Sequence, residues 1–237
     1  MKPKGTQHMR YTMTKASVIG LSILTLAAAA AMAQTRPEPR KPLTPVTEDM
    51  LRNPPPADWL MWRRTYDAWG YSPLDGINKN NVKRLNVAWT WSLSSGATEI
   101  TPIVHDGVLF VFNYADKVQA LNATNGDLLW EYKRDLPAPL VAEAGNPLAK
   151  RSMAIFGDNL IVATSDAHLI ALNVNTGKLT WDRAVADWTK GWRYTGGPMI
   201  AGGKIIQGMS GCGNAQPGGC YITGHDPQNG AEAWRFY

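Results

Sequence analysis

The chain has 237 residues, of which 44% are hydrophobic and 18% are charged, so it can bury a sizeable core and is not disordered throughout. The formal net charge is +5, but residues 1–33 hold four basic residues and no acidic one, and their removal lowers it to +1. The remaining chain therefore lacks the strong positive charge of a protein that binds nucleic acid or a membrane surface.

Residues 1–33 have the pattern of a secretory signal peptide. Basic residues precede an apolar run at 16–33, which ends in Ala31-Met32-Ala33. The alternative is an uncleaved anchor, since a run of about 18 residues approaches the length of a membrane span. The weakly apolar alanines and the Ala-Met-Ala ending favour cleavage after Ala33. We therefore expect export to the periplasm and no stable membrane span in the mature chain.

Residues 34–56 are rich in proline, arginine and threonine and end in three consecutive prolines. Such a composition is typical of an extended lead-in and not of a packed element. The globular pattern begins at residue 57.

Short apolar runs separated by turn signals follow. The first of them occupy residues 103–104, 108–112, 118–121 and 128–130. Each has the length and the β-branched or aromatic content of a strand, and Asp106-Gly107 and Asn125-Gly126 are hairpin turn signals. No segment after residue 60 has a long helical period, so the chain is predicted to be all-β.

A hairpin pattern repeats three times. Trp130, Trp181 and Trp234 lie 51 and 53 residues apart, and each follows a turn glycine by four positions. A period near 50 with four short strands per unit is typical of a β-propeller blade. One blade cannot bury both of its faces, so we expect each indole to fill the gap between neighbours. The near-equal spacing argues against a hairpin pattern that recurs by chance. Trp89-Thr90-Trp91 is assigned to an earlier, less regular unit.

The repeat Ala-Leu-Asn-x-x-(Asn/Thr)-Gly-x-x-x-Trp resembles the tryptophan-docking motif of dehydrogenases that depend on pyrroloquinoline quinone (PQQ). Residues 58–67 and 71–74 resemble the N-terminal signature of that family, which residues 80–85 and 88–89 continue, and the similarity extends from about residue 44 to the last residue. The third repeat departs from the motif, with Asp226 in place of its asparagine.

The resemblance implies an eight-bladed propeller. Residues 57–237 suffice for about three to four blades of four antiparallel strands. We therefore expect an incomplete propeller, truncated at its C-terminus, with unpaired blade faces that make the isolated chain unstable or prone to aggregate.

The resemblance also assigns five cofactor-binding residues: Glu99, Arg151, Thr195, Ser210 and Gly211. PQQ is a planar quinone with three carboxylates, and a guanidinium fork such as that of Arg151 suits a carboxylate. The alternatives are a solvated glutamate, a surface arginine, and hydroxyl groups that only cap turns.

Two departures from the family concern the same site. Gly145 and Asn146 stand where many members have adjacent cysteines that cover one face of PQQ. Gly213 stands where many members have a metal-binding glutamate. The resemblance implies a calcium or lanthanide ion beside PQQ, but its ligands remain unassigned.

The two cysteines, Cys212 and Cys220, are expected to form a disulfide because an exported chain meets an oxidising compartment. The bridge would either shape the edge of the cofactor pocket or simply staple an exposed loop. No Cys-x-x-Cys-His haem site is present.

The predicted function is that of the N-terminal portion of a periplasmic, PQQ-dependent alcohol dehydrogenase. In this family a catalytic aspartate acts on the alcohol and a cytochrome accepts the electrons. That aspartate is expected beyond the C-terminus, so the chain alone is expected to be inactive. The alternative is a periplasmic propeller scaffold that is not an enzyme and has similar tryptophan repeats. Such a scaffold has no need for Glu99, Arg151 or Thr195 near the propeller axis.

Overall fold

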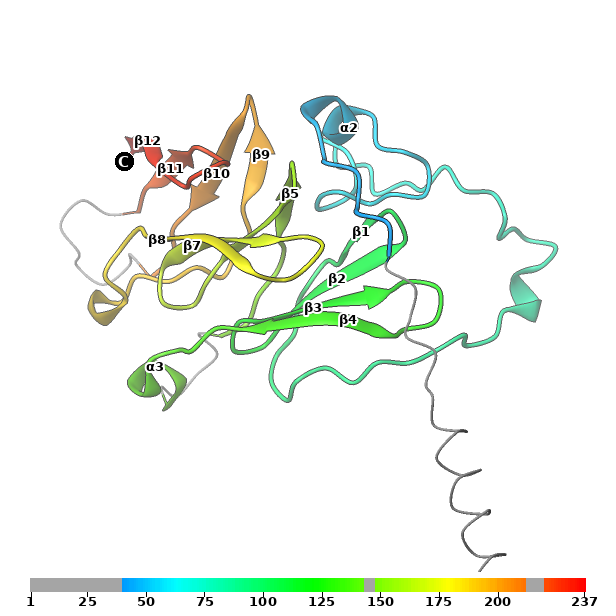
Figure 1. Ribbon diagram of the computed structural model, residues 1–237, viewed down its shortest axis with the longest axis horizontal. Coiled ribbons are helices and arrows are strands. Elements are labelled where there is room, and N and C mark those ends of the chain that lie inside the picture. Colours follow the sequence, from blue (N-terminus) through cyan, green and yellow to red (C-terminus); the bar gives the residue numbers. More distant parts are fainter. Residues whose placement is uncertain (1–39, 143–147, 212–219) are drawn as a thin grey trace, which may run out of the picture. The chain divides into compact units, whose positions relative to one another are not determined.

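Three antiparallel sheets of four strands each form the core of the protein (Figure 1). The computed structural model describes residues 40–142, 148–211 and 220–237, and Pro42–Tyr237 form one compact unit. The first sheet contains β1 (Ile103–His105), β2 (Val108–Asn113), β3 (Lys117–Asn122) and β4 (Leu128–Lys133). The second contains β5 (Ala154–Phe156), β6 (Asn159–Ala163), β7 (His168–Asn173) and β8 (Leu179–Ala184). The third contains β9 (Met199–Ala201), β10 (Lys204–Gly208), β11 (Ile222–His225) and β12 (Glu232–Phe236).

Each sheet is a meander in which consecutive strands pair with one another, as expected for a propeller blade. The three sheets are therefore called blades 1, 2 and 3. The prediction of an all-β chain built from four-stranded blades is confirmed, and the three blades described do not close into a ring.

The middle strands of the first two blades carry most of the core. Phe110 of β2, Ile161 of β6 and Leu169 of β7 are fully buried, because both faces of these strands are covered. The last strand of each blade is mostly exposed, with Leu128 of β4 and Leu179 of β8 open to solvent. Apolar residues therefore form continuous runs in the middle of a blade and are interrupted by polar residues at its outer edge.

The turn before the last strand has the same geometry in all three blades. The amides of Gly126, Gly177 and Gly230 each donate to a carbonyl four residues earlier, and all three glycines have positive φ. In blade 3 the side chain of Asp226 accepts from the amide two residues later, as the asparagines do in the other blades. Aspartate and asparagine both offer that oxygen, which explains why Asp226 leaves the turn intact.

The indoles of Trp130 and Trp181 lie over the turn glycine of the next blade. The ring of Trp130 covers Gly177 and that of Trp181 covers Gly230, and Trp89 covers Gly126 in the same way. The indole N–H groups of Trp89, Trp130 and Trp181 donate to Ala123, Val174 and Pro227 at 3.1, 2.9 and 3.3 Å. The prediction that indoles join neighbouring blades is confirmed, and Trp89 acts in this role from a segment without a strand.

The segment before blade 1 differs from the predicted extended lead-in. It contains a short helix, α2 (Glu48–Arg52), whose first turn is capped by the side chain of Thr47. Leu43, Val46 and Leu51 are buried, so this part packs as an element of the core. The predicted signal peptide at 1–33 lies outside the described residues.

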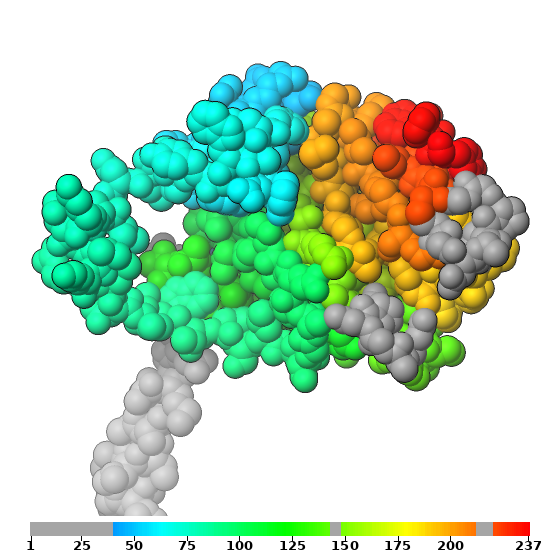
Figure 2. Space-filling model, turned by 180° about the vertical axis from the view of Figure 1, so that it is seen from behind, coloured from blue at the N-terminus to red at the C-terminus, as the bar shows by residue number. Residues whose placement is uncertain are grey.

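The chain between this helix and blade 1 is irregular and contains one turn of 3-10 helix, η1 (Val82–Arg84). Trp69 and Val87 are more than three-quarters exposed, and Figure 2 shows part of this stretch, in teal, standing away from the sheets. Two further short elements, α3 (Ala138–Ala142) and η2 (Trp188–Lys190), connect the blades. None of the helices in the described ranges is both long and apolar enough to span a bilayer.

Candidate functional site

Three of the residues assigned to cofactor binding occupy equivalent places in the three blades. Glu99 lies just before β1, Arg151 just before β5 and Thr195 just before β9. These are the first strands of their blades, and β5 and β9 contact each other. Residues far apart in the sequence are therefore brought to the same end of neighbouring strands.

Glu99 and Arg151 form an ion pair. The distance from Nη2 of Arg151 to Oε2 of Glu99 is 2.7 Å, and the side chains are 51% and 46% exposed for the arginine and the glutamate. The backbone supports the pair, because the amide of Thr101 donates to the carbonyl of Arg151 at 2.8 Å. An ion pair this exposed contributes about 0–1 kcal/mol to stability, so fold stability alone does not explain it.

Ser210 is fixed beside the segment that carries Thr195. It forms an antiparallel bridge with Arg193, and its hydroxyl donates to the carbonyl of Arg193 at 2.8 Å. The hydroxyl oxygen retains its capacity to accept a hydrogen bond.

Gly211 has a structural reason to be glycine. Its φ is +83°, and a Cβ there would overlap the carbonyl oxygen of Gly191. The close approach of two backbone segments therefore explains this residue without any ligand.

Two contacts join the Arg151 segment to the Thr195 segment. A Cβ on Gly197 would overlap Ser152, so these backbones are in direct contact. The ammonium of Lys150 donates to the carbonyl of Tyr194 at 2.7 Å. The structure therefore gathers Glu99, Arg151 and Thr195 in one region, and Ser210 and Gly211 adjoin it through Arg193.

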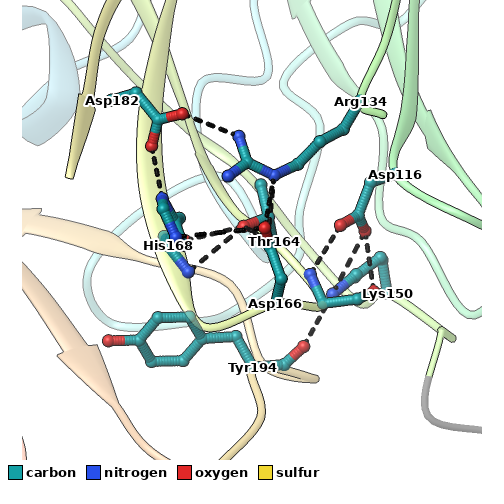
Figure 3. Close-up of polar contacts among 9 residues, drawn as sticks. Asp116, Arg134, Lys150, Thr164, Asp166, His168, Asp182 and Tyr194 are labelled. Carbon is teal, nitrogen blue, oxygen red and sulfur yellow. Dashed lines mark hydrogen bonds and ion pairs between the residues drawn. The ribbon is translucent and has the colours of Figure 1, made fainter. Parts of the chain in front are cut away.

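Lys150, the neighbour of Arg151 in the chain, forms a buried ion pair with Asp116 (Figure 3). Lys150 and Asp116 are each 1% exposed, and Nζ lies 3.3 Å from Oδ1 of the aspartate. Asp116 also accepts hydrogen bonds from the amide and the hydroxyl of Ser165, at 2.5 and 3.0 Å. Burial lowers the pKa of the Lys150 ammonium, and attraction to Asp116 offsets part of this effect.

A second charged group links blades 1 and 2 (Figure 3). Arg134, which follows β4, donates to both carboxylate oxygens of Asp166 and, at 2.9 Å, to Asp182. Burial alone would lower the pKa of Arg134, but the hydrogen bonds to both aspartates outweigh it and the pKa is raised. His168 contacts Asp182 at 2.6 Å. Burial acts to raise the pKa of Asp182, but the hydrogen bonds from His168 and Arg134 lower it overall.

Sequence reasoning missed these buried charges. The position of Lys150 directly before Arg151 was the one hint that this lysine belongs to the site. However, a lysine in a loop is ordinarily solvated, so its burial was not predicted. Four other positions discussed for this site, Gly145, Asn146, Cys212 and Gly213, lie outside the described residues. The disulfide between Cys212 and Cys220 therefore remains a prediction.

One histidine group resembles a metal site in composition. Ligand atoms of Asp58, His105 and Asp106 lie within 4.8 Å of one another. However, the two ring nitrogens of His105 contact Asp58 and the carbonyl of Thr44, each at 2.7 Å. We interpret this group as a hydrogen-bonded link between the N-terminal segment and β1.

The donor set at the end of the first strands fits an anionic, hydrogen-bonding ligand such as PQQ. Arg151 is half exposed and retains N–H groups beyond the one that contacts Glu99. Thr195 is only partly buried.

Comparison with known proteins agrees with this fit. Residues 59–237 match the family of glucose, ethanol and alcohol dehydrogenases with a PQQ β-propeller domain. A curated relative, the quinohemoprotein alcohol dehydrogenase ADH IIB of Pseudomonas putida, is 34% identical over 181 residues, which are 76% of this chain and 26% of the relative. The chain spans about a quarter of the length of the curated relatives that it matches.

Solved structures show the same relationship. The quinohemoprotein alcohol dehydrogenase ADHIIG of Pseudomonas putida HK5 superposes with a TM-score of 0.74 at 30% identity, over 84% of this chain and 29% of that one. A europium-containing methanol dehydrogenase superposes with a TM-score of 0.71 at 29% identity, over 78% of this chain and 32% of that one.

Proposed function

The chain belongs to the β-propeller family of PQQ-dependent glucose, ethanol and alcohol dehydrogenases, and we propose that residues 57–237 supply one side of the PQQ site of a periplasmic alcohol dehydrogenase. The observation that carries the proposal is the ion pair of Glu99 and Arg151, which lies at the same end of the first strands as Thr195. An exposed pair joined to a second polar segment offers a ligand several directed hydrogen bonds.

Arg151 is proposed to bind a carboxylate of the cofactor. Glu99 occupies one N–H edge of the guanidinium and thereby orients the group. The remaining N–H groups are available for a planar, bidentate contact with a carboxylate. Glu99 also has oxygen lone pairs that accept a hydrogen bond from the ligand.

Thr195 and Ser210 are proposed to contact the same ligand through their hydroxyl groups. Ser210 uses its own proton for the carbonyl of Arg193, so it would act as an acceptor. Gly211 is proposed to allow close approach, although its contact with Gly191 already requires glycine.

PQQ, when bound, would supply the quinone that accepts two electrons from an alcohol. The resemblance implies a calcium or lanthanide ion beside it, and the europium-containing relative agrees with that expectation. Gly213 stands where many members have a metal-binding glutamate, and this position lies outside the described residues. The residues that would hold the ion are therefore not part of the proposal.

The proposal includes export by residues 1–33, an alcohol as the substrate and a cytochrome as the electron acceptor. We also propose that this chain by itself does not oxidise alcohols. The family resemblance implies that the catalytic aspartate lies outside residues 57–237.

A binding experiment tests the site. The chain is titrated with PQQ, and tryptophan fluorescence reports binding. Arg151→Ala is expected to raise Kd about tenfold, the effect of losing one charge-assisted hydrogen bond. Arg52→Ala is the matched control, because Arg52 is also an exposed arginine in an ion pair, at 57% exposure, but lies in α2. Equal Kd values for the two variants, or no saturable binding by the wild type, would contradict the proposed site.

An activity assay tests the second part. Alcohol-dependent reduction of a dye by the chain, with added PQQ and calcium, is expected to equal the background without protein. Sustained turnover would show that the chain holds a complete active site.

A further inference from the structure

We propose that Lys150 is a positioning residue that holds the segments carrying Arg151 and Thr195 at a fixed separation, a role that rests on the proposed PQQ site. The lysine, Asp116 and the carbonyl of Tyr194 are here called the Lys150 clamp (Figure 3). Its members come from blade 1, from the segment before blade 2 and from the segment before blade 3.

The contacts of the ammonium group define the clamp. Nζ of Lys150 donates to the carbonyl of Tyr194 at 2.7 Å and lies 3.3 Å from the carboxylate of Asp116. The face of Phe112 lies 5.7 Å from the same nitrogen. Asp166 and Arg193 are the other charged groups that act on it electrostatically. One ammonium therefore connects three blades, immediately beside two proposed ligand-binding residues.

Asp116 is itself held in place. It lies in the turn between β2 and β3 with positive φ, and its carboxylate accepts two hydrogen bonds from Ser165 in the turn between β6 and β7. A carboxylate with these fixed partners gives the ammonium a rigid anchor.

The residues next to Lys150 extend the effect to the proposed site. The carbonyl of Arg151 accepts from the amide of Thr101, close to Glu99 in the chain. Ser152 contacts Gly197, close to Thr195. The short segment 150–152 is thus tied to the segments before both β1 and β9, and moving it would displace all three proposed ligand-binding side chains.

Stability gives no sufficient reason for this ion pair. Replacing a buried pair by apolar or neutral groups is often neutral for folding, whereas removing only one partner is strongly destabilising. A buried lysine at this junction is therefore better explained by geometry, because its directed hydrogen bond specifies where the carbonyl of Tyr194 lies.

The test removes the clamp without leaving a lone buried charge. The double variant Lys150→Met/Asp116→Asn is made in the full chain. A matched control, Asp58→Asn/His105→Gln, removes another buried pair, whose contacts lie at β1 and the N-terminal segment and whose charges do not act on Lys150. Lys150→Met alone shows whether a loss of folding arises from the uncompensated Asp116.

Hydrogen exchange is the first readout and needs no cofactor. In the clamp variant, the amides of segments 149–152 and 193–197 are expected to exchange at least tenfold faster, with β2 and β7 unchanged. In the control variant these two segments are expected to keep their wild-type rates. Unchanged exchange in the clamp variant, or equal acceleration everywhere, would overturn the proposal.

PQQ affinity in a double-mutant cycle is the second readout. The clamp variant is expected to raise Kd about tenfold, within the range of coupling energies inside one hydrogen-bonded network. In an Arg151→Ala background the same change is expected to raise Kd by a smaller factor than in the wild type, because the part of its effect that acts through Arg151 is already lost and only the displacement of Glu99 and Thr195 remains. Full additivity would indicate a merely structural role and overturn the proposal.

The two readouts separate this inference from the proposed function. If the wild type does not bind PQQ, the proposed function fails, and local exchange alone supports or overturns the clamp. If the wild type binds and Arg151→Ala weakens binding but the clamp variant does not, the clamp fails and the proposed function stands.

Discussion

Blades 2 and 3 have the same tryptophan at the same strand position but expose it differently. Trp181 of β8 is 8% exposed and lies over Gly230 of blade 3, whereas Trp234 of β12 is 41% exposed. Among the described residues no further blade lies beside Trp234. Within their own blades the two indoles pair with small residues, Trp181 opposite Ala171 and Trp234 opposite Gly224.

The difference shows that the motif encodes an interface. The strand and the small partner place the indole, but only a neighbouring turn glycine removes it from water and offers its N–H a carbonyl. The tryptophan of the repeat therefore stabilises the fold mainly through the interface between neighbouring blades, as in other repeat proteins.

The largest expected effect compares the two tryptophans directly. Trp181→Ala is expected to cost about 3–5 kcal/mol of unfolding free energy, because it leaves a cavity between blades. Trp234→Ala is expected to cost less than about 1 kcal/mol, because the indole is already partly hydrated. Urea denaturation of both variants measures this, and equal losses would show that the interface does not explain the difference.

A smaller effect is expected when the glycine under a docked indole is changed. Gly177 has positive φ and a Cβ there would lie 2.5 Å from the ring of Trp130, whereas Gly107 has positive φ and open space. Backbone strain of roughly 1–2 kcal/mol is expected in both alanine variants. Overpacking should add about 1–3 kcal/mol to Gly177→Ala alone. If the two variants unfold at the same urea concentration, the indole does not pack tightly on the turn.

A pH dependence is expected in blade 3. Burial lowers the pKa of His225 below 6.5, and a weaker hydrogen bond to Gly230 opposes this. The unfolded chain then binds the proton more tightly, so stability is complete above pH 6.5 and falls as the pH decreases below it. His225→Gln should reduce the loss of stability between pH 7 and 5. An identical pH profile for the variant and the wild type would refute the assignment to His225.

The smallest effect concerns the one residue of the blade 3 turn that departs from the repeat. Asp226→Asn restores the asparagine of blades 1 and 2 and is expected to change stability by less than about 0.5 kcal/mol, because both side chains supply the acceptor oxygen. Asp226→Ala removes that acceptor and should cost about 1 kcal/mol. A large gain in stability for Asp226→Asn would mean that the turn itself weakens blade 3, and that the exposure of Trp234 is not the cause.

Much of the fold could be predicted because its signals are local. The turn glycines, the spacing of the tryptophans and the short apolar runs lie within single hairpins, and the three blades follow them. The packed segment around α2 was missed because three prolines and many polar residues dominate its composition. Two of its buried residues have backbone partners far along the chain, since Leu43 meets the side chain of Asn175 and Val46 forms a bridge with Gly157.

Part of the candidate site could be predicted from the sequence, and part could not. Motifs in the sequence assigned Glu99, Arg151 and Thr195 to the site. The structure shows why they meet, because each lies just before the first strand of its blade. The Lys150 clamp could not be predicted, because nothing near Lys150 in the sequence indicates that Asp116 and the carbonyl of Tyr194 surround it.

The sequence by itself determined the hairpins, the blade period and the positions of the indoles, because each depends on residues within a few positions of one another. The tertiary structure decided which indoles are buried, that Lys150 is enclosed while Lys190 is exposed, and that Arg151 meets Glu99. Burial and electrostatic environment depend on which distant segments meet, and that is settled only when one blade packs against the next.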